Sequence, residues 1–90
     1  MAGQWSVELS GPARRGLERL PAKIAGAALE FMAGALVDEP TRVGKPLRLD
    51  RVGEYTARRG SWRTIYALDT DRHLIRILAI GPRSEVYRPR

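Results

Sequence analysis

Three β-strand patterns joined by very short turns constrain the fold of this chain more than any other feature of its sequence. Glu54–Arg59 and Trp62–Asp69 are separated only by Gly60-Ser61, a glycine-first pair that is typical of a two-residue hairpin turn. Residues 69–72 supply the next turn, and the very hydrophobic segment His73–Gly81 follows it. Strands joined by such short turns pair antiparallel. The sequence therefore predicts a meander in which His73–Gly81 is the central strand.

Alternation within these strands predicts which side chains share a face. In Trp62–Asp69 one face is expected to carry Arg63, Ile65 and Ala67, and the other Trp62, Thr64, Tyr66 and Leu68. The sequence leaves open which of these faces is buried. In His73–Gly81 we expect one face to carry Leu74, Leu78 and Ile80, and the other Ile75 and Ile77. Arg76 then either displays its charge on an open face or forms a salt bridge with Glu8 or Glu54.

The first half of the chain is predicted to contain one strand and two helices. Residues 4–10 alternate between apolar and polar side chains, which is typical of a half-buried strand. Ser10 or Gly11 then caps a helix that has a proline in its first turn, where the missing N–H costs nothing. Pro21 ends this helix and starts a second one, which continues until Asp38.

The order strand, helix, helix and three strands predicts an α+β fold. Two N-terminal helices are expected to pack on one face of a twisted antiparallel sheet of about four strands. Residues 41–53 are predicted to be a loop with at most one short strand, because glycine and proline interrupt them. Gly26 and Gly34 in the second helix are expected to allow close packing of the first. We expect residues 1–90 to form a single domain, since a chain of 90 residues can bury only one modest core.

Positive charge is concentrated in the second half of the chain. Sixteen basic residues, fourteen of them arginine, and ten acidic residues give a net charge of +6. Residues 1–41 carry a net charge of −1 and residues 42–90 a net charge of +7. Guanidinium groups match phosphate oxygens in pairs and stack on bases. The basic half therefore favours nucleic acid or another polyanion as a partner, with a merely solvated surface as the alternative.

Composition excludes several other classes of protein. Hydrophobic residues make up 43% of the chain and charged residues 29%, as in an ordinary globular domain and unlike a disordered or collagen-like chain. The longest apolar-leaning stretch, residues 24–37, is too short and too mixed to cross a bilayer. The sequence has no cysteine, and no basic region followed by an apolar run at its start. We therefore expect a cytoplasmic protein without disulfides and without contact with a membrane.

The residue arrangements usually found in hydrolytic, metal and nucleotide sites are missing from the sequence. The single histidine, His73, lies beside a predicted turn and is expected to be structural. Gly44-Lys45-Pro46 lacks both the glycine pattern and the following Ser or Thr of a phosphate-binding loop. No cluster has metal-ligand spacing, so the sequence predicts no metal ion and no cofactor. Arginine, lysine and tyrosine remain as the residues that could carry chemistry.

Four segments carry a family resemblance: WSVELS, ARRGLERLP, EPTRVGKPLRLDRVGEYTARRGSWRTIYALD and ILAIGPRSEVYR. In order and spacing they resemble the RelE branch of the RelE/ParE toxin family of bacterial toxin–antitoxin systems. The resemblance covers residues 5–88, and RRGSWRTIY and IGPRSEVYR are its most specific parts. It implies a small α+β toxin that cleaves mRNA in the ribosomal A site as a metal-independent endoribonuclease. It also implies a cognate, RelB-like antitoxin that silences the toxin in a hetero-oligomer.

The resemblance also implies site residues. Arg63 after the hairpin turn, Arg83 after the strand-ending glycine, and the near-terminal Tyr87 match catalytic positions of the family. Other basic residues of the second half are expected to bind RNA: Lys45, Arg48, Arg58, Arg59, Arg76 and Arg88. The chain departs from the family pattern at Thr56, where a second basic residue is common two positions before Arg58. It also has Pro82 where His or Lys is frequent.

These residue types suit RNA cleavage by the substrate's own 2′-hydroxyl group. Arginine can stabilise the charge that builds up on phosphorus, but with a pKa above 12 it is a poor base. Tyr87, with an ordinary pKa of about 10, is a better candidate if Arg63 and Arg83 lower that pKa. Tyr87 could instead stack on a base of the RNA. Because the ribosome would position the substrate, we expect naked RNA to be cleaved poorly.

Three other functions are compatible with the sequence. A ParE-like toxin would poison DNA gyrase and would need no nuclease residues. A non-catalytic RNA-binding module would use the basic half as a platform, and a decayed toxin would keep only antitoxin binding. In each toxin reading, the antitoxin is expected to lay a helix or strand over the sheet and its arginines, or to bind the helical face.

Overall fold

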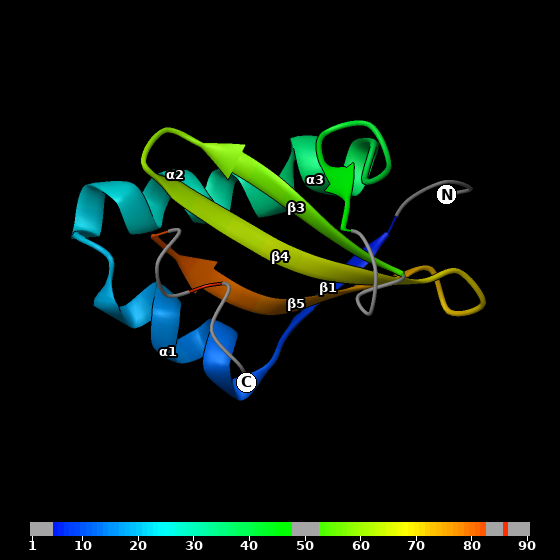
Figure 1. The fold of residues 1–90 in the computed structure, drawn as a ribbon, viewed down its shortest axis with the longest axis horizontal. Coiled ribbons are helices and arrows are strands. Elements are labelled where there is room, and N and C mark those ends of the chain that lie inside the picture. Colours follow the sequence, from blue (N-terminus) through cyan, green and yellow to red (C-terminus); the bar gives the residue numbers. More distant parts are fainter. Residues whose placement is uncertain (1–4, 48–52, 83–85, 87–90) are drawn as a thin grey trace.

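The computed structural model describes residues 5–47, 53–82 and 86. Their elements follow the chain in this order (Figure 1): β1 (Ser6–Leu9), α1 (Gly11–Arg19), α2 (Ala22–Ala33), α3 (Ala35–Asp38), β2 (Lys45–Pro46), β3 (Glu54–Arg59), β4 (Trp62–Asp69) and β5 (Leu74–Gly81). This is the α+β arrangement that the sequence predicts. None of the described helices is long and apolar enough to span a bilayer.

The strands of the described residues form one mixed sheet with the order β1-β5-β4-β3-β2. The meander of β3, β4 and β5 is antiparallel, as predicted. The expectation of about four antiparallel strands is wrong in two respects, because β2 adds a fifth strand and β1 pairs parallel with β5. The parallel pair is possible because helices and strands intervene between β1 and β5, as a parallel crossover requires. β5 is an interior strand, but β4 is the central one.

Both turns of the meander rely on residues with positive φ. Gly60 has a φ of 61°, and the φ of Ser61 is not positive. This combination is the pattern of a type II′ hairpin turn. His73, which ends the next turn, has a φ of 51°. Its ring stacks on Trp5 at a centroid distance of 4.5 Å, and its carbonyl accepts a hydrogen bond from the Ser6 N–H at 2.9 Å. His73 thus joins the turn to β1, in agreement with its predicted structural role.

A bulge in β5 changes the alternation of its side chains. Ile65 of β4 pairs with Ala79, but the next residue, Tyr66, pairs with Ile77. Leu78 is therefore an extra residue in β5, as in a β-bulge. Strict alternation cannot reveal such an insertion, because the residues on either side of it keep an ordinary strand pattern.

The bulge makes one prediction about β5 wrong. Ile75, Ile77 and Ile80 all belong to the main core beneath the helices. Leu78 and Ala79 instead belong to a smaller cluster with Ile65 and Val86. Leu78 and Ile80, which strict alternation places on one face, consequently lie on opposite faces of the sheet.

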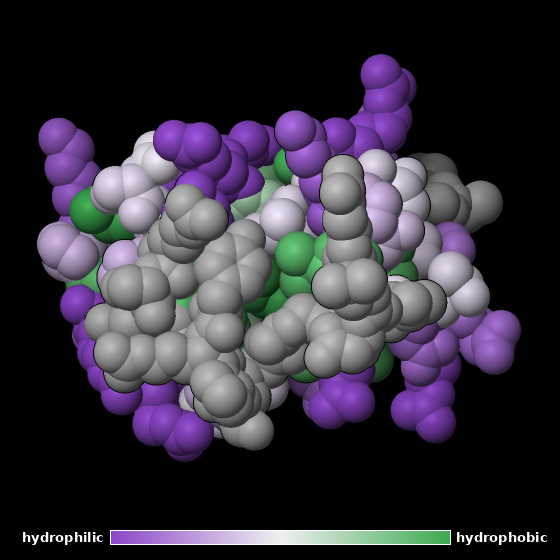
Figure 2. All heavy atoms as spheres, in the orientation of Figure 1, coloured by the Kyte–Doolittle hydropathy of each residue, from purple (hydrophilic) through white to green (hydrophobic). Residues whose placement is uncertain are grey.

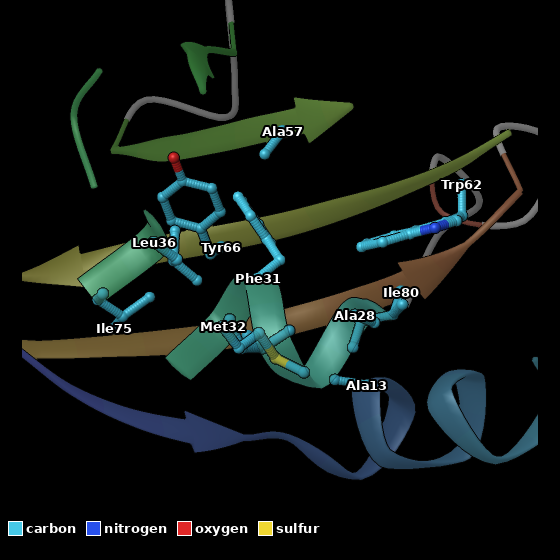
Figure 3. Packing of buried hydrophobic residues seen from close by; sticks show 11 residues of the cluster. Ala13, Ala28, Phe31, Met32, Leu36, Ala57, Trp62, Tyr66, Ile75 and Ile80 are labelled. Atoms are coloured by element: carbon cyan, nitrogen blue, oxygen red, sulfur yellow. The ribbon is translucent and has the colours of Figure 1, made fainter. Parts of the chain in front are cut away.

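The main hydrophobic core lies between the sheet and the helices, and α2 and α3 lie behind the sheet in the view of Figure 1. Figure 3 shows Phe31 of α2 reaching toward Trp62 and Tyr66 of β4. The Phe31 and Trp62 rings meet edge to face at 6.3 Å. The fully buried side chains of this core include Leu36 and Ile75. The face of β4 that carries Trp62 and Tyr66 is thus the buried one, which the sequence leaves open.

The first helix begins at a residue that also contacts the β5 bulge. Ser10 is the N-cap of α1, and its hydroxyl accepts a hydrogen bond from the Ala13 N–H at 3.2 Å. The same hydroxyl donates to the Leu78 carbonyl at 3.1 Å. Ser10 therefore stabilises the start of α1 and satisfies a carbonyl of the bulged residue.

α1 lies against β5 at Gly16, which is a buried glycine. A Cβ atom at this position would meet the carbonyl oxygen of Ile80. The predicted role of Gly26 and Gly34 in close helix packing is wrong, because a Cβ at Gly26 would meet nothing within 4 Å and one at Gly34 only the Glu30 carbonyl. Gly34, with φ −114° and ψ −92°, instead separates α2 from α3.

Tyr66 carries a hydroxyl group in the middle of the main core. This hydroxyl donates a hydrogen bond to the Pro40 carbonyl at 2.6 Å, and the ring stacks on Tyr55 at 5.6 Å. Burial raises the pKa of Tyr66 to about 12; Tyr55 adds to the increase, and Arg59 opposes it.

The raised pKa of Tyr66 predicts a loss of stability at alkaline pH. The native state holds the Tyr66 proton more tightly than the unfolded chain does. The stability that this difference contributes is complete below pH 10 and is lost as the pH rises toward about 12. We expect the loss to reach about 2 kcal/mol. Urea titrations across this range should show the decline in the wild type and a smaller one in Tyr66→Phe. An equal decline in both proteins would contradict the assignment.

Candidate functional site

Basic side chains from three neighbouring strands lie on the sheet face opposite the helices, which we call the open face. On β3, Tyr55 and Ala57 pack in the main core, so Thr56 and Arg58 between and after them point to the open face. On β4, Trp62 packs in the main core, so the side chain of Arg63, the next residue along the strand, points to the open face.

The strand register brings these side chains together. Lys45 of β2 is opposite Thr56 of β3, and Arg58 of β3 is opposite Arg63 of β4. All four residues line one pocket with Val43 and Gly44, with a volume of about 330 Å³. Lys45 and Arg58 are exposed, whereas Arg63 is half-buried. The pocket therefore presents three cationic side chains, and none of the described residues that line it is acidic.

Gly44 is what allows β2 to lie this close to β3. A Cβ atom here would meet the hydroxyl of Tyr66 and would lie 2.8 Å from the Thr56 carbonyl oxygen. Lys45 follows Gly44 directly, so the close approach places Lys45 beside β3. Gly44 therefore determines the shape of the pocket, a role that is not predicted above. The glycine immediately before Lys45 is the feature of the sequence that indicates it.

Some other arginines of the described residues form ion pairs with carboxylates. Arg42 contacts Glu39 at 3.2 Å, and Arg72 contacts Asp69 at 3.8 Å. In the described part of the chain, Lys45, Arg58 and Arg63 form no such ion pair. Arg58 and Arg63 instead face each other across the ladder, and like charges directly opposite are destabilising. An anion between them would remove this repulsion, so the pocket is suited to a phosphate group.

Two further predicted RNA-binding residues lie outside the pocket. Arg59 is on the helix side of the sheet, where its guanidinium lies 4.4 Å from the centre of the Phe31 ring. Arg76 is on β5 and forms an exposed ion pair with Glu8 at 3.7 Å, one of the two partners foreseen for it. Arg76 pairs with Ala67, four residues along β4 from Arg63, which corresponds to about 13 Å.

Four of the predicted site residues lie outside the described residues: Arg48, Arg83, Tyr87 and Arg88. Two described residues that are near Arg83 and Tyr87 in the sequence, Gly81 and Val86, contact the strands of the open face. Gly81 pairs with Arg63, so β5 ends beside the pocket arginine. Val86 is buried on the open face with Ile65 and Ala79, and its N–H donates to the Pro82 carbonyl at 3.1 Å.

The open face combines an apolar centre with charged surroundings. Figure 2, which views this face, shows hydrophobic surface near its centre and hydrophilic surface along its upper and lower edges. The apolar cluster of this face consists of Ile65, Ala79 and Val86, with Leu47 and Leu78 packed against it. Among the described residues, no three His, Cys, Asp or Glu side chains gather to form a metal site.

Comparison with known proteins places this geometry in a family. The protein-family model described as the ParE toxin of the type II toxin–antitoxin system parDE matches residues 7–87 of this chain. Toxin RelE of Mycobacterium tuberculosis is 46% identical over 84 residues, which are 93% of this chain and 87% of that protein. Toxin RelG of the same organism is 42% identical over 84 residues, which are 93% of this chain and 97% of that protein.

The fold agrees with this relationship. A chain in the crystal structure of the toxin–antitoxin complex RelBE2 from M. tuberculosis matches with a TM-score of 0.85 and 41% identity, over 89% of this chain and 99% of that chain. The resemblance noted in the sequence is therefore confirmed over nearly the whole chain. This protein belongs to the RelE/ParE toxin family of type II toxin–antitoxin systems.

Proposed function

We propose that this toxin is a ribosome-dependent endoribonuclease that cleaves mRNA in the A site and thereby inhibits translation. The observation that carries the proposal is the pocket in which Lys45, Arg58 and Arg63 converge, with no acidic side chain among its described lining residues. Three cations from three strands provide charge-assisted donors for the oxygens of a phosphodiester. Among the described residues that line the pocket there is no aromatic side chain on which a base could stack, which suits an enzyme whose substrate is positioned by another particle.

The chemistry that we propose uses the 2′-hydroxyl group of the RNA as the nucleophile. Arg58 and Arg63 would hold the scissile phosphate and stabilise the additional negative charge of the transition state. Arg83 would join them, and Tyr87 would remove the proton from the 2′-hydroxyl. Two described contacts support these roles: Gly81 pairs with Arg63, and Val86, next to Tyr87 in the sequence, is buried on the same open face. We propose that no metal ion is required.

We also propose a RelB-like antitoxin as the partner that silences the toxin. The related M. tuberculosis chain was crystallised in a toxin–antitoxin complex. The open face offers an apolar cluster of Ile65, Ala79 and Val86 beside the basic pocket. An antitoxin segment with apolar and acidic side chains would cover both features and would exclude RNA from the pocket.

The family also contains toxins of the ParE type, and gyrase poisoning is therefore the second candidate function. The family model that matches this chain is the ParE toxin model, whereas the two similar M. tuberculosis proteins are named RelE and RelG. A gyrase poison has no need for three converging cations on the open face. The pocket thus favours the nuclease.

The test of the proposed function compares three reactions of the purified toxin. We expect cleavage of mRNA that occupies a ribosome with an empty A site, little cleavage of the same mRNA without ribosomes, and no effect on DNA supercoiling by gyrase. Positioning by the ribosome is worth several kcal/mol, so the difference between the first two reactions should exceed about 100-fold. Rapid cleavage of free mRNA, or inhibition of gyrase with intact mRNA, would overturn the proposal.

A further inference from the structure

Lys45 differs chemically from the other cations of the pocket. The chain has sixteen basic residues, of which only Lys23 and Lys45 are lysines. Lys23 is on α2, whereas Lys45 lines the pocket with Arg58 and Arg63. A guanidinium group keeps its proton throughout the accessible pH range, but an ammonium group can give up a proton and recover it. Among the described lining residues, Lys45 is thus the cation best suited to proton transfer.

The position of Lys45 suits such a role. It is opposite Thr56 on the neighbouring strand, and Thr56 is the position at which this chain lacks a basic residue. Arg58 and Arg63 form a facing pair on β3 and β4, and Lys45 approaches the same pocket from the other side, from β2. A phosphate held by the arginine pair would therefore have one side covered by guanidinium groups and another side within reach of a flexible ammonium group.

The reaction needs a proton on that second side. Cleavage expels the 5′-oxygen of the following nucleotide, and an alkoxide is a poor leaving group unless a proton reaches it in the transition state. Arg58 and Arg63 are weaker acids than Lys45, because the ordinary pKa of a guanidinium group is about two units or more above that of an ammonium group.

We propose that Lys45 is a catalytic residue, the general acid that protonates the 5′-oxygen leaving group; this inference rests on the proposed nuclease function. As the bond from the 2′-oxygen to phosphorus forms, the bond from phosphorus to the 5′-oxygen breaks. The 5′-oxygen takes a proton from the Lys45 ammonium, and the 2′-hydroxyl proton goes to the phenolate form of Tyr87, the base of the proposed function. The products are a 2′,3′-cyclic phosphate and a 5′-hydroxyl end, and Lys45 and Tyr87 then return to their initial states by proton exchange with water.

The experiment separates the charge of Lys45 from its proton. Lys45→Arg keeps the positive charge, and Lys45→Gln removes it; Lys23→Arg and Lys23→Gln are the matched controls on the helical side. Each variant is assayed on ribosome-bound mRNA with an ordinary 5′-oxygen and with a 5′-sulfur at the scissile bond. A thiolate leaves without protonation, so the sulfur substrate does not need a general acid. Affinity is measured separately with a 2′-deoxy residue at the cleavage position.

For the ordinary substrate we expect Lys45→Arg to cleave at least about 100-fold more slowly than the wild type, with affinity retained within about threefold. For the sulfur substrate, Lys45→Arg should cleave within about threefold of the wild type. Both Lys23 variants should behave as the wild type on both substrates. Because Lys45 is exposed, its replacement should leave folding intact, which thermal unfolding checks.

Two results would overturn the inference. Full activity of Lys45→Arg on the ordinary substrate would show that charge alone is required. A defect of equal size on both substrates would show that Lys45 holds the phosphate without protonating the leaving group. If the wild type itself leaves ribosome-bound mRNA intact, the proposed function fails and this inference fails with it, so the two failures are distinguishable.

Discussion

Replacement of Arg63 by Ala is expected to slow ribosome-dependent mRNA cleavage by about 100- to 1,000-fold. This is the usual effect of removing one preorganised hydrogen-bond donor to an anion that develops in the transition state. Arg63 is half-buried on the open face, opposite Arg58 and beside Gly81. Its side chain is therefore held more firmly than that of an exposed arginine, and a firmly held donor needs little reorganisation in the transition state. Single-turnover cleavage with saturating toxin measures the chemical step.

The matched control for Arg63→Ala is Arg72→Ala, which makes the same change in charge. Arg72 lies in the turn before β5, where it contacts Asp69 and is 79% exposed. We expect this variant to cleave within about twofold of the wild type, because an exposed ion pair contributes at most about 1 kcal/mol and lies outside the pocket. Equal losses in both variants would indicate a general effect of net charge on binding to the ribosome.

Replacement of Gly16 by Ala is expected to lower the free energy of unfolding by about 2–4 kcal/mol, mainly through overpacking. The added Cβ would meet the carbonyl oxygen of Ile80, and a backbone atom of an interior strand cannot move aside. α1 would have to shift away from β5, which would also disturb the hydrogen bond between Ser10 and Leu78. For a domain of this size the loss corresponds to a decrease in Tm of roughly 10–25 °C. Thermal and urea unfolding measure it.

Gly26→Ala is the control for Gly16→Ala, because it makes the same substitution in a helix where the Cβ would meet nothing within 4 Å. The greater helix propensity of alanine should stabilise this variant by up to about 1 kcal/mol. If Gly16→Ala were as stable as Gly26→Ala, the close approach of α1 to β5 would be refuted.

Local patterns allowed much of this fold to be predicted from sequence. The bounds of β3 and β4 and the Gly60-Ser61 turn follow from turn chemistry and alternation. The parallel pairing of β1 with β5 could not be predicted in the same way, since it depends on where the helices return the chain. The extra residue Leu78 was also hidden, because an insertion changes the faces of a strand without changing its composition.

The site was predictable in part for similar reasons. Lys45, Arg58 and Arg63 share one pocket, and their roles in binding and cleaving RNA stay predictions. Arg59 lies over Phe31 on the helix side, and the alternation of β3 already contained this information, because neighbours in a strand face opposite ways. Arg76 forms an ion pair with Glu8 because the parallel register of β1 places these two residues side by side. The sequence does not contain this register, so it could not decide between Glu8 and Glu54.

The central claim is that Arg63, Arg83 and Tyr87 act together on one phosphodiester of ribosome-bound mRNA. Primer extension on a defined mRNA, after induction of the wild type or of Arg63→Ala, Arg83→Ala or Tyr87→Phe, tests it most directly. We predict cuts within codons of translated mRNA in the wild type and their loss in all three variants, with each variant still bound by the antitoxin. Wild-type cut patterns in the variants, or cuts that persist when translation is blocked, would contradict the claim.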